Sequence, residues 1–194
     1  MRELVRTLRA MSQITFLRNL ALSAAAVLAA AQGSAQGLRP TGYFVQGGLA
    51  GGGDWSATAG LVWPWAWKSS LWGTQLSASA EASISHWDAK GSTHRNGFTH
   101  VALVPLLRVR FDGGRSAWFA EGGIGVSLMD QQFVTQTKQF TTAFNFVDTL
   151  GVGISLGPSR EQELGLRLQH VSNAGIRVPN PGQNFLQLRY GSTF

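Results

Sequence analysis

After the first forty residues, apolar and polar side chains alternate along most of the chain. Residues 75–85 show this most clearly: Leu76, Ile84 and the alanines between them share one face, and Glu81 and the serines share the other. Successive side chains of a β-strand point to opposite faces, so a period of two indicates strands. Eight strands are predicted, at about residues 42–50, 55–63, 75–85, 100–111, 118–128, 144–156, 163–173 and 184–194.

Apolar and polar residues alternate both in a soluble sandwich and in a membrane barrel, so alternation alone does not distinguish the two. The chemistry of the two faces does. A soluble core strand is rarely this polar on its inner face. In a small outer-membrane barrel the apolar face looks outward at lipid, and polar or very small residues face inward. We therefore predict an all-β fold, an eight-stranded antiparallel transmembrane β-barrel. Its interior charges should pair with one another, because an unpaired buried charge is strongly unfavourable; they are Glu81, Arg108, Arg110, Glu121 and Arg167.

The connections are expected to alternate between two kinds. An even strand count places both ends of the chain on one side, the periplasm, with short turns there and longer loops outside. Segments 112–116 and 157–160 are short enough for turns, whereas 86–97 and 129–142 are long and polar, as external loops are. Segment 64–74 holds three tryptophans, and we interpret it as a periplasmic turn whose tryptophans lie at the membrane interface.

Residues 1–35 have the pattern of an export signal. Several arginines precede an apolar run, Leu20–Ala31, and the small residues Gly33–Ala35 follow at a predicted cleavage site. An N-terminal membrane anchor is the weaker alternative, because the run is shorter than the roughly 20 residues that a spanning helix needs. We expect a cleaved signal peptide over 1–35, with Met11 as an alternative start, and an outer-membrane barrel over 36–194.

Composition narrows the function classes. The net charge is +6, but much of it lies in the predicted leader, and no run of basic and aromatic residues follows that would favour nucleic-acid binding. The absence of cysteine excludes disulfides, cysteine nucleophiles and thiolate metal sites. His86, His94 and His100 lack metal-ligand spacing with carboxylates, so we predict no metal. The glycine-rich segment 47–53 lacks the helix and lysine of a phosphate loop and is predicted to be strand and turn.

A histidine and a serine continue the apolar face of the seventh predicted strand. The leucines of Leu164–Leu168 mark that outward face, and His170 and Ser172 follow on it. Their Cα atoms would lie about 7 Å apart on one side of the strand, within reach of a hydrogen bond. Histidine can take the serine proton at neutral pH, and Asn173 and Gly175 can offer an amide and a backbone N–H to an oxyanion. The spacing alone leaves open that the pair is merely polar residues at the membrane interface.

The end of the chain resembles a known family. His170-x-Ser172-Asn173-Ala174, then Pro179-Asn180-x-Gly182, then a strand that ends on Phe194, is similar to the lipid A 3-O-deacylases of the PagL family. The resemblance covers the chain from His170 onward. It implies an outer-membrane barrel that hydrolyses the ester-linked 3-hydroxyacyl chain at position 3 of lipid A. It also implies that Ser172 is the nucleophile, His170 the general base, Asn173 an oxyanion donor and Asn180 a loop residue of the site.

The sequence departs from the family at one catalytic position. The family triad is completed by a glutamate on the last strand, and the matching position here is Asn184; the neighbouring Gln183 has no carboxylate either. A neutral partner can orient a histidine but cannot stabilise the imidazolium by charge. Asp148 faces outward on the sixth predicted strand, where a carboxylate is costly. If the strands flanking the 157–160 turn pair in register, Asp148 neighbours His170, and we propose it as a substitute acid.

The sequence as a whole predicts a lipid A esterase that takes its substrate laterally from the outer membrane, without a cofactor. Two alternatives stay open: a noncatalytic barrel of structural or adhesin type, and a lipid A acyltransferase barrel with an interior site. A homodimer is also left open. Four cations in the predicted external loops either meet the phosphates of lipid A or are merely solvated; they are Lys90, Arg95, Lys138 and Arg177.

Overall fold

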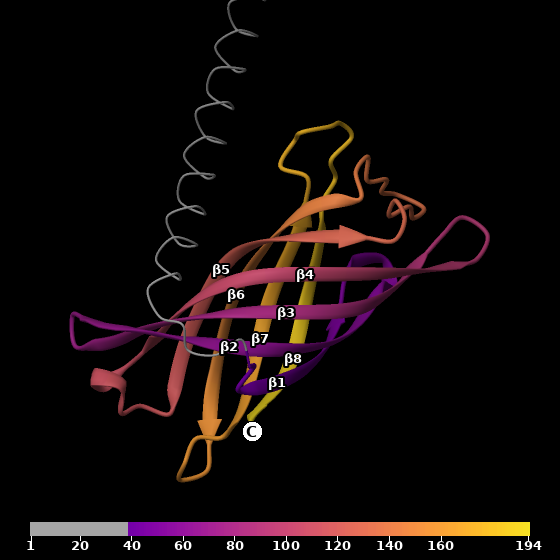
Figure 1. Ribbon diagram of the computed structural model, residues 1–194. Helices are drawn as coiled ribbons and strands as arrows, with labels where there is room; N and C mark the ends of the chain where they lie inside the picture. The colour runs from indigo at the N-terminus through magenta and orange to yellow at the C-terminus, as the bar shows by residue number, and fades with distance from the viewer. Residues whose placement is uncertain (1–38) are drawn as a thin grey trace, which may run out of the picture. The chain divides into compact units, whose positions relative to one another are not determined.

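The computed structural model describes residues 39–194, so the predicted signal peptide lies outside the described residues. Eight strands form a closed antiparallel barrel in sequence order, and β8 pairs with β1 (Figure 1). The predicted fold is confirmed. No helix within residues 39–194 has the length and apolar character needed to cross a membrane. The strands are β1 (Gly42–Leu49), β2 (Trp55–Leu71), β3 (Thr74–Lys90), β4 (Arg95–Arg110), β5 (Trp118–Met129), β6 (Phe144–Leu156), β7 (Gln162–Ser172) and β8 (Gln183–Thr193).

Two predicted connections turn out to be strand. β2 continues through most of the predicted 64–74 turn, and the chain reverses at Trp72 and Gly73, which both have positive φ. A register shift between Pro64 and Lys68 accommodates the proline, which has no N–H for the ladder. The predicted 86–97 loop is also wrong, because β3 and β4 leave only residues 91–94 to connect them. In the extension of β3, Trp87 and Ala89 are buried inside the barrel against side chains from distant segments, so the polar residues around them did not mark the end of the strand.

The two ends of the described chain meet at one end of the barrel. Gly42, the first residue of β1, pairs with Thr193 of β8, and Figure 1 shows the C-terminus beside the start of β1. We call this end the terminal rim. The opposite end, the loop rim, carries the connections 50–54, 91–94, 130–143 and 173–182.

The outer wall of the barrel is apolar and its interior is charged. Arg167 is 4% exposed and donates to Glu81 at 2.7 Å and to Glu121 at 2.5 Å. Arg108 donates to the other carboxylate oxygen of Glu121 at 2.8 Å. The predicted pairing of interior charges is therefore confirmed for these four residues. Arg110 also pairs with a carboxylate, that of Glu163 at 3.6 Å, and donates to backbone carbonyls and a serine hydroxyl. Two charges that the prediction did not include join the network, Glu163 and Arg189.

Toward the loop rim the interior becomes aromatic instead. The 130–143 loop folds inward, so that Phe133 and Phe140 are fully buried, and a bridge between Val134 and Gln139 closes it into a small hairpin. Phe133 packs edge-on against Trp87 of β3 at 5.7 Å between ring centroids. The sequence prediction of a polar external loop missed this inserted hairpin. The hairpin fills the barrel mouth and fixes the neighbouring 173–182 loop.

Candidate active site on the outer wall

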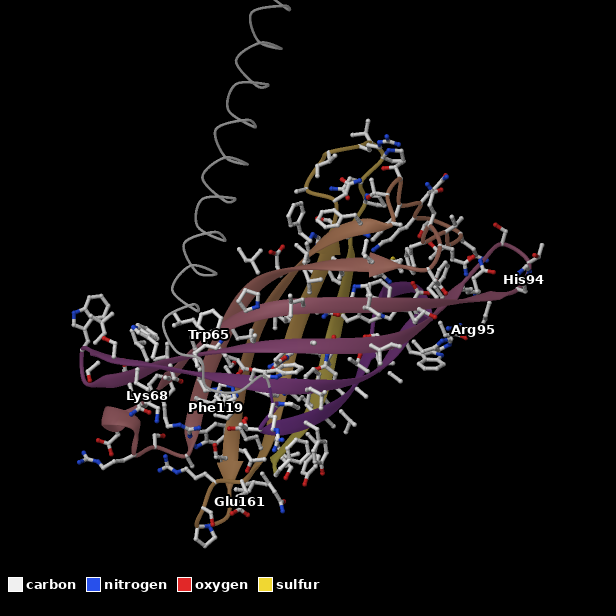
Figure 2. The ribbon with its side chains drawn as sticks, in the orientation of Figure 1. Trp65, Lys68, His94, Arg95, Phe119 and Glu161 are labelled. Carbon is white, nitrogen blue, oxygen red and sulfur yellow. The ribbon has the colours of Figure 1, made fainter. Side chains whose placement is uncertain are left out.

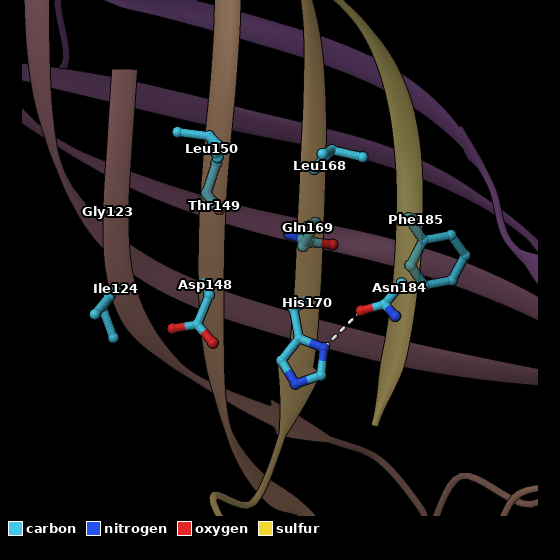
Figure 3. Close-up of a pocket in the computed structure, with 10 residues that line it drawn as sticks. All are labelled: Gly123, Ile124, Asp148, Thr149, Leu150, Leu168, Gln169, His170, Asn184 and Phe185. Carbon is cyan, nitrogen blue, oxygen red and sulfur yellow. Dashed lines mark hydrogen bonds between the residues drawn. The ribbon is translucent and has the colours of Figure 1, made fainter. Parts of the chain in front are cut away.

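Four neighbouring strands place one residue each in a row across the outer wall. The register sets Ile124 of β5 opposite Asp148 of β6, Asp148 opposite His170 of β7, and His170 opposite Asn184 of β8. Figure 3 shows Asp148 and Asn184 on either side of the imidazole. The predicted register across the 157–160 turn is confirmed, and Asp148 neighbours His170 as expected. The row lies close to the loop rim, because β7 ends two residues later at Ser172.

A hydrogen bond determines which nitrogen of His170 is basic. His170 Nδ1 and Asn184 Oδ1 are 2.6 Å apart. An amide oxygen can only accept, so the ring proton lies on Nδ1. Nε2 then keeps its lone pair and can take a proton. Asn184 therefore fixes the tautomer that a general base requires, although it brings no charge.

Ser172 is the last residue of β7 and lies two residues beyond His170 on the same side of the strand. It is only 9% exposed, so its hydroxyl is shielded from bulk solvent. The backbone N–H of Ala174 points at Ser172 Oγ from 3.5 Å, a long contact, and Ala174 adopts a positive φ of 52°. The chain thus turns sharply after the serine and brings a backbone donor back toward its oxygen.

The residues predicted to bind an oxyanion are engaged within the 173–182 loop. Asn173 is 1% exposed; its Nδ2 donates to Thr141 Oγ1 at 3.1 Å and to the carbonyl of Arg177 at 3.0 Å. Its Oδ1 accepts the N–H of Gly175 at 2.9 Å. The backbone N–H of Asn173 donates to Asn180 Oδ1 at 3.0 Å. These contacts hold the turn, and sequence reasoning missed that they leave Ala174 as the donor facing Ser172.

A shallow groove runs along the outer wall beside the row. Leu150 and Leu168 are 64% and 57% exposed, and Figure 3 shows both on the side of the row that leads away from the loop rim. Gly123 of β5 contributes to the floor without a side chain. Among the described residues that line this groove, Asp148 is the one carboxylate. An apolar groove that begins at a histidine suits a hydrocarbon chain with a polar bond at one end.

The four candidate cations of the loop rim differ in what they contact. Arg95 pairs with Asp88 within the β3–β4 hairpin. Lys138 is half-buried and donates to the backbone of Gly182. The side chains of Lys90 and Arg177 are exposed. Lys138 and Arg177 therefore lie on the two loops beside the row, and Arg95 belongs to a different hairpin.

Comparison with known proteins identifies the family. The model of the family described as lipid A 3-O-deacylase (PagL) matches residues 51–193, which is most of the chain. The chain belongs to this family. Two relatives carry the name lipid A deacylase PagL. The protein of Bordetella bronchiseptica is 36% identical over 123 residues, covering 63% of this chain and 65% of its own length. That of Pseudomonas aeruginosa is 30% identical over 129 residues, covering 65% of this chain and 72% of its own length.

A solved structure of the deacylase family has the same architecture. The crystal structure of the outer membrane enzyme PagL aligns with 79% of this chain and 99% of its own, with a TM-score of 0.69 and 26% sequence identity. The family consists of ester hydrolases built on outer-membrane β-barrels. The predicted recognition of the family and of its fold is confirmed, and the match spans just under two thirds of the Bordetella relative.

Proposed function

We propose that this protein is a lipid A 3-O-deacylase of the outer membrane, which hydrolyses the ester holding the 3-hydroxyacyl chain at position 3 of lipid A. The observation that carries the proposal is the placement of His170. Its ring is bound to Asn184 through Nδ1, lies on the lipid-facing wall two residues from Ser172, and opens onto an apolar groove. A substrate that stays in the bilayer can reach such a site laterally, and no cofactor is needed for ester hydrolysis.

The reaction begins at Ser172. Nε2 of His170 takes the hydroxyl proton as Oγ attacks the ester carbonyl carbon, and the carbonyl electrons move to its oxygen. When the carbonyl re-forms, the bond to the sugar oxygen breaks, and that oxygen leaves with the proton from Nε2. The acyl group is now on Ser172 Oγ. A water molecule deprotonated by His170 then attacks the acyl carbon, which releases the 3-hydroxy fatty acid and restores Ser172.

The oxyanion donor in this proposal is the N–H of Ala174. Its nitrogen lies 3.5 Å from Ser172 Oγ, and the carbonyl oxygen that becomes negative is one bond away from the carbon that Oγ attacks, so this N–H is close enough to be redirected to it. Asn173, Gly175 and Asn180 serve by holding the turn that aims Ala174. This assignment replaces the direct oxyanion contacts that the sequence suggested for Asn173 and Gly175, since both are already hydrogen-bonded within the loop.

Asp148 is proposed to supply the charge that Asn184 lacks. Both residues neighbour His170 in the register, one on each side of the ring. The imidazolium that forms during attack is stabilised by a nearby carboxylate, and Asn184 only orients the ring. A carboxylate facing lipid is costly, which favours a role that offsets this cost.

The orientation of the barrel is part of the proposal. With both termini in the periplasm, the loop rim and the row of Asp148, His170 and Asn184 lie in the outer leaflet, where lipopolysaccharide is found. Lys90 and Arg177, which are exposed at this rim, then face the phosphates of the lipid surface. A homodimer stays a prediction.

The test is the mass of lipid A in a lipopolysaccharide-bearing host that expresses the protein. We expect one 3-hydroxyacyl chain to be lost, and Ser172→Ala to abolish that loss. Ser70→Ala, an exposed serine near the opposite end of the barrel, is the matched control and should behave like the unchanged protein. A gained acyl chain would identify a transferase instead, and an unchanged lipid A would favour the noncatalytic barrel; either result refutes the proposal.

A further inference from the structure

Lys138 is held by the loop that leads into β8. Its Nζ donates to the backbone carbonyl of Gly182 at 2.9 Å and to Gln183 Oε1 at 2.6 Å. Lys138 belongs to the inward-folded hairpin, and Gly182 and Gln183 lie in the segment where β8 begins. Two of the three protons of the ammonium are thus committed to protein acceptors rather than to solvent.

Gly182 lies directly against the imidazole of His170. A Cβ atom built on Gly182 would be 2.6 Å from His170 Cε1 and 3.3 Å from Nε2, and the residue has a φ of +63°. Both the contact and the left-handed backbone favour glycine at this position. The backbone held by Lys138 is therefore one wall of the space that the ring occupies, on the edge that carries the basic nitrogen.

The ammonium is balanced by a buried carboxylate through Gln183. Gln183 is fully buried, and its Nε2 donates to Asp54 Oδ2 at 2.8 Å. Asp54 is 5% exposed, and its other oxygen accepts the backbone N–H of Lys90 at 2.9 Å. Lys138, Gln183 and Asp54 form one hydrogen-bonded line across the barrel mouth, with a charge of opposite sign at each end. The hydrogen bonds of such a chain polarise and strengthen one another, so Gln183 in the middle resists displacement.

The hairpin that carries Lys138 is anchored firmly enough to act as a support. Phe133 and Phe140 are buried on its two arms, and their backbones are joined by a hydrogen bond of 2.8 Å. Thr135 Oγ1 accepts the N–H of Lys138 at 2.9 Å, which closes the tip. Thr141 of the same hairpin contacts Asn173 and the carbonyl of Pro179. The hairpin thus braces the 173–182 loop at both of its ends.

We infer that Lys138 is a positioning residue for deacylation, which holds Gly182 against His170 so that the ring stays in the orientation in which Asn184 fixes its Nδ1 proton. The inference rests on the proposed function. It assigns Lys138 to the enzyme's own geometry and not to the phosphates of the substrate. Loss of the ammonium frees Gly182 and widens the range of ring orientations, so it lowers kcat while substrate binding is kept.

The absence of cysteine from the chain allows a clean chemical test. Lys138→Cys removes the ammonium, and alkylation with 2-bromoethylamine then installs an ammonium at nearly the length of lysine, at that position alone. With purified protein and lipid A in detergent, we expect kcat to fall about tenfold in Lys138→Cys, with KM changed less than about twofold, and to recover after alkylation. Lys68→Cys, treated identically, is the matched control. Lys68 belongs to β2, and Figure 2 shows it toward the end of the barrel opposite His94 and Arg95.

Each other outcome overturns the inference. A raised KM with unchanged kcat would make Lys138 a ligand of the substrate, and unchanged kcat and KM would leave it without a role. A loss of kcat that alkylation does not reverse would point to damage of the hairpin. Imidazole ¹⁵N resonances provide a readout without turnover: the His170 signals should shift in Lys138→Cys and return on alkylation. If they do not shift, the inference fails; if they shift but the unchanged protein releases no fatty acid, the proposed function alone fails.

Discussion

The interior of the barrel and its outer wall use polar groups in opposite ways. Inside, Arg167 spans two carboxylates, Glu81 and Glu121, and each of these also receives a second arginine. On the outer wall, His170 has one hydrogen bond among the described residues, through Nδ1, and Asp148 is a carboxylate that lies between Ile124 and His170. Both regions come from the same strands, since His170 and Arg167 are three residues apart on β7.

The difference separates groups that stabilise the fold from groups that can react. A buried charge whose partners are all present has no capacity left for a substrate, and removing one partner exposes the cost of burying the others. A histidine with one nitrogen fixed and the other free is prepared to accept a proton. The alternation of a strand assigns these two roles by parity, because successive residues face opposite sides of the wall.

The largest effect that separates the two regions is expected at His170. His170→Ala removes the proposed base, and we expect kcat for deacylation to fall about 10³-fold, as for a general base. The same substitution should change the protein's free energy of unfolding little, because the His170 side chain lies on the surface and has a single hydrogen bond. Lipid A mass spectrometry and denaturant titration of the same preparation measure both quantities. A marked loss of stability would contradict the division between the regions.

The reciprocal change is Arg167→Met in the interior. It leaves Glu81 and Glu121 without their shared partner, so the free energy of unfolding should fall by about 3 kcal/mol. We take the lower end of the range for a broken buried pair, because Arg189 still pairs with Glu81 and Arg108 with Glu121. Denaturant titration in detergent measures the loss. Among molecules that remain folded kcat should be unchanged, and a matching loss of kcat would show that the interior network also shapes the site.

A smaller effect tests the charge on the outer wall. Asp148→Asn keeps the shape of the side chain but removes its charge, and we expect kcat to fall about tenfold because the imidazolium loses a nearby carboxylate. Adding Asn184→Glu to the same chain moves a carboxylate to the other side of the ring and should restore kcat to within about twofold. Asp148→Glu is the conservative control and should retain activity.

That comparison can fail in two ways. If Asp148→Asn has the kcat of the unchanged protein, the carboxylate plays no part in stabilising His170. If Asn184→Glu does not restore the loss, Asp148 acts on something other than the charge of the ring, such as the substrate sugar.

The parts of the site that lie on strands could be predicted from the sequence. Alternation placed His170 and Ser172 on the outward face, and the short 157–160 turn set Asp148 opposite His170. Both arguments are local, because a strand has a fixed period and a tight turn fixes the register that follows it. The extensions of β2, β3 and β4 could not be predicted; in β3, for example, Trp87 is buried against Phe133, which comes from a loop 46 residues away in the chain.

The parts that lie on loops could not be predicted. Asn173 and Gly175 offer donors to an oxyanion in the sequence, and only the folded loop shows that those donors are hydrogen-bonded within it. Their contact with an oxyanion stays a prediction. The inserted hairpin was also missed: Phe133 and Phe140 are seven residues apart in a segment rich in glutamine and threonine, and only the open barrel mouth gives them a place to pack.

The sequence by itself determined the number of strands, the face that each residue takes, the family to which the chain belongs and the identity of the chemical groups. The tertiary structure alone decided which donors stay free, which charges share a partner, and that Lys138 meets Gly182 beside His170. The physical reason is the distance along the chain over which each effect acts. Alternation and turn length act between neighbours in the chain, whereas hydrogen-bond satisfaction depends on groups that only the closed barrel brings together.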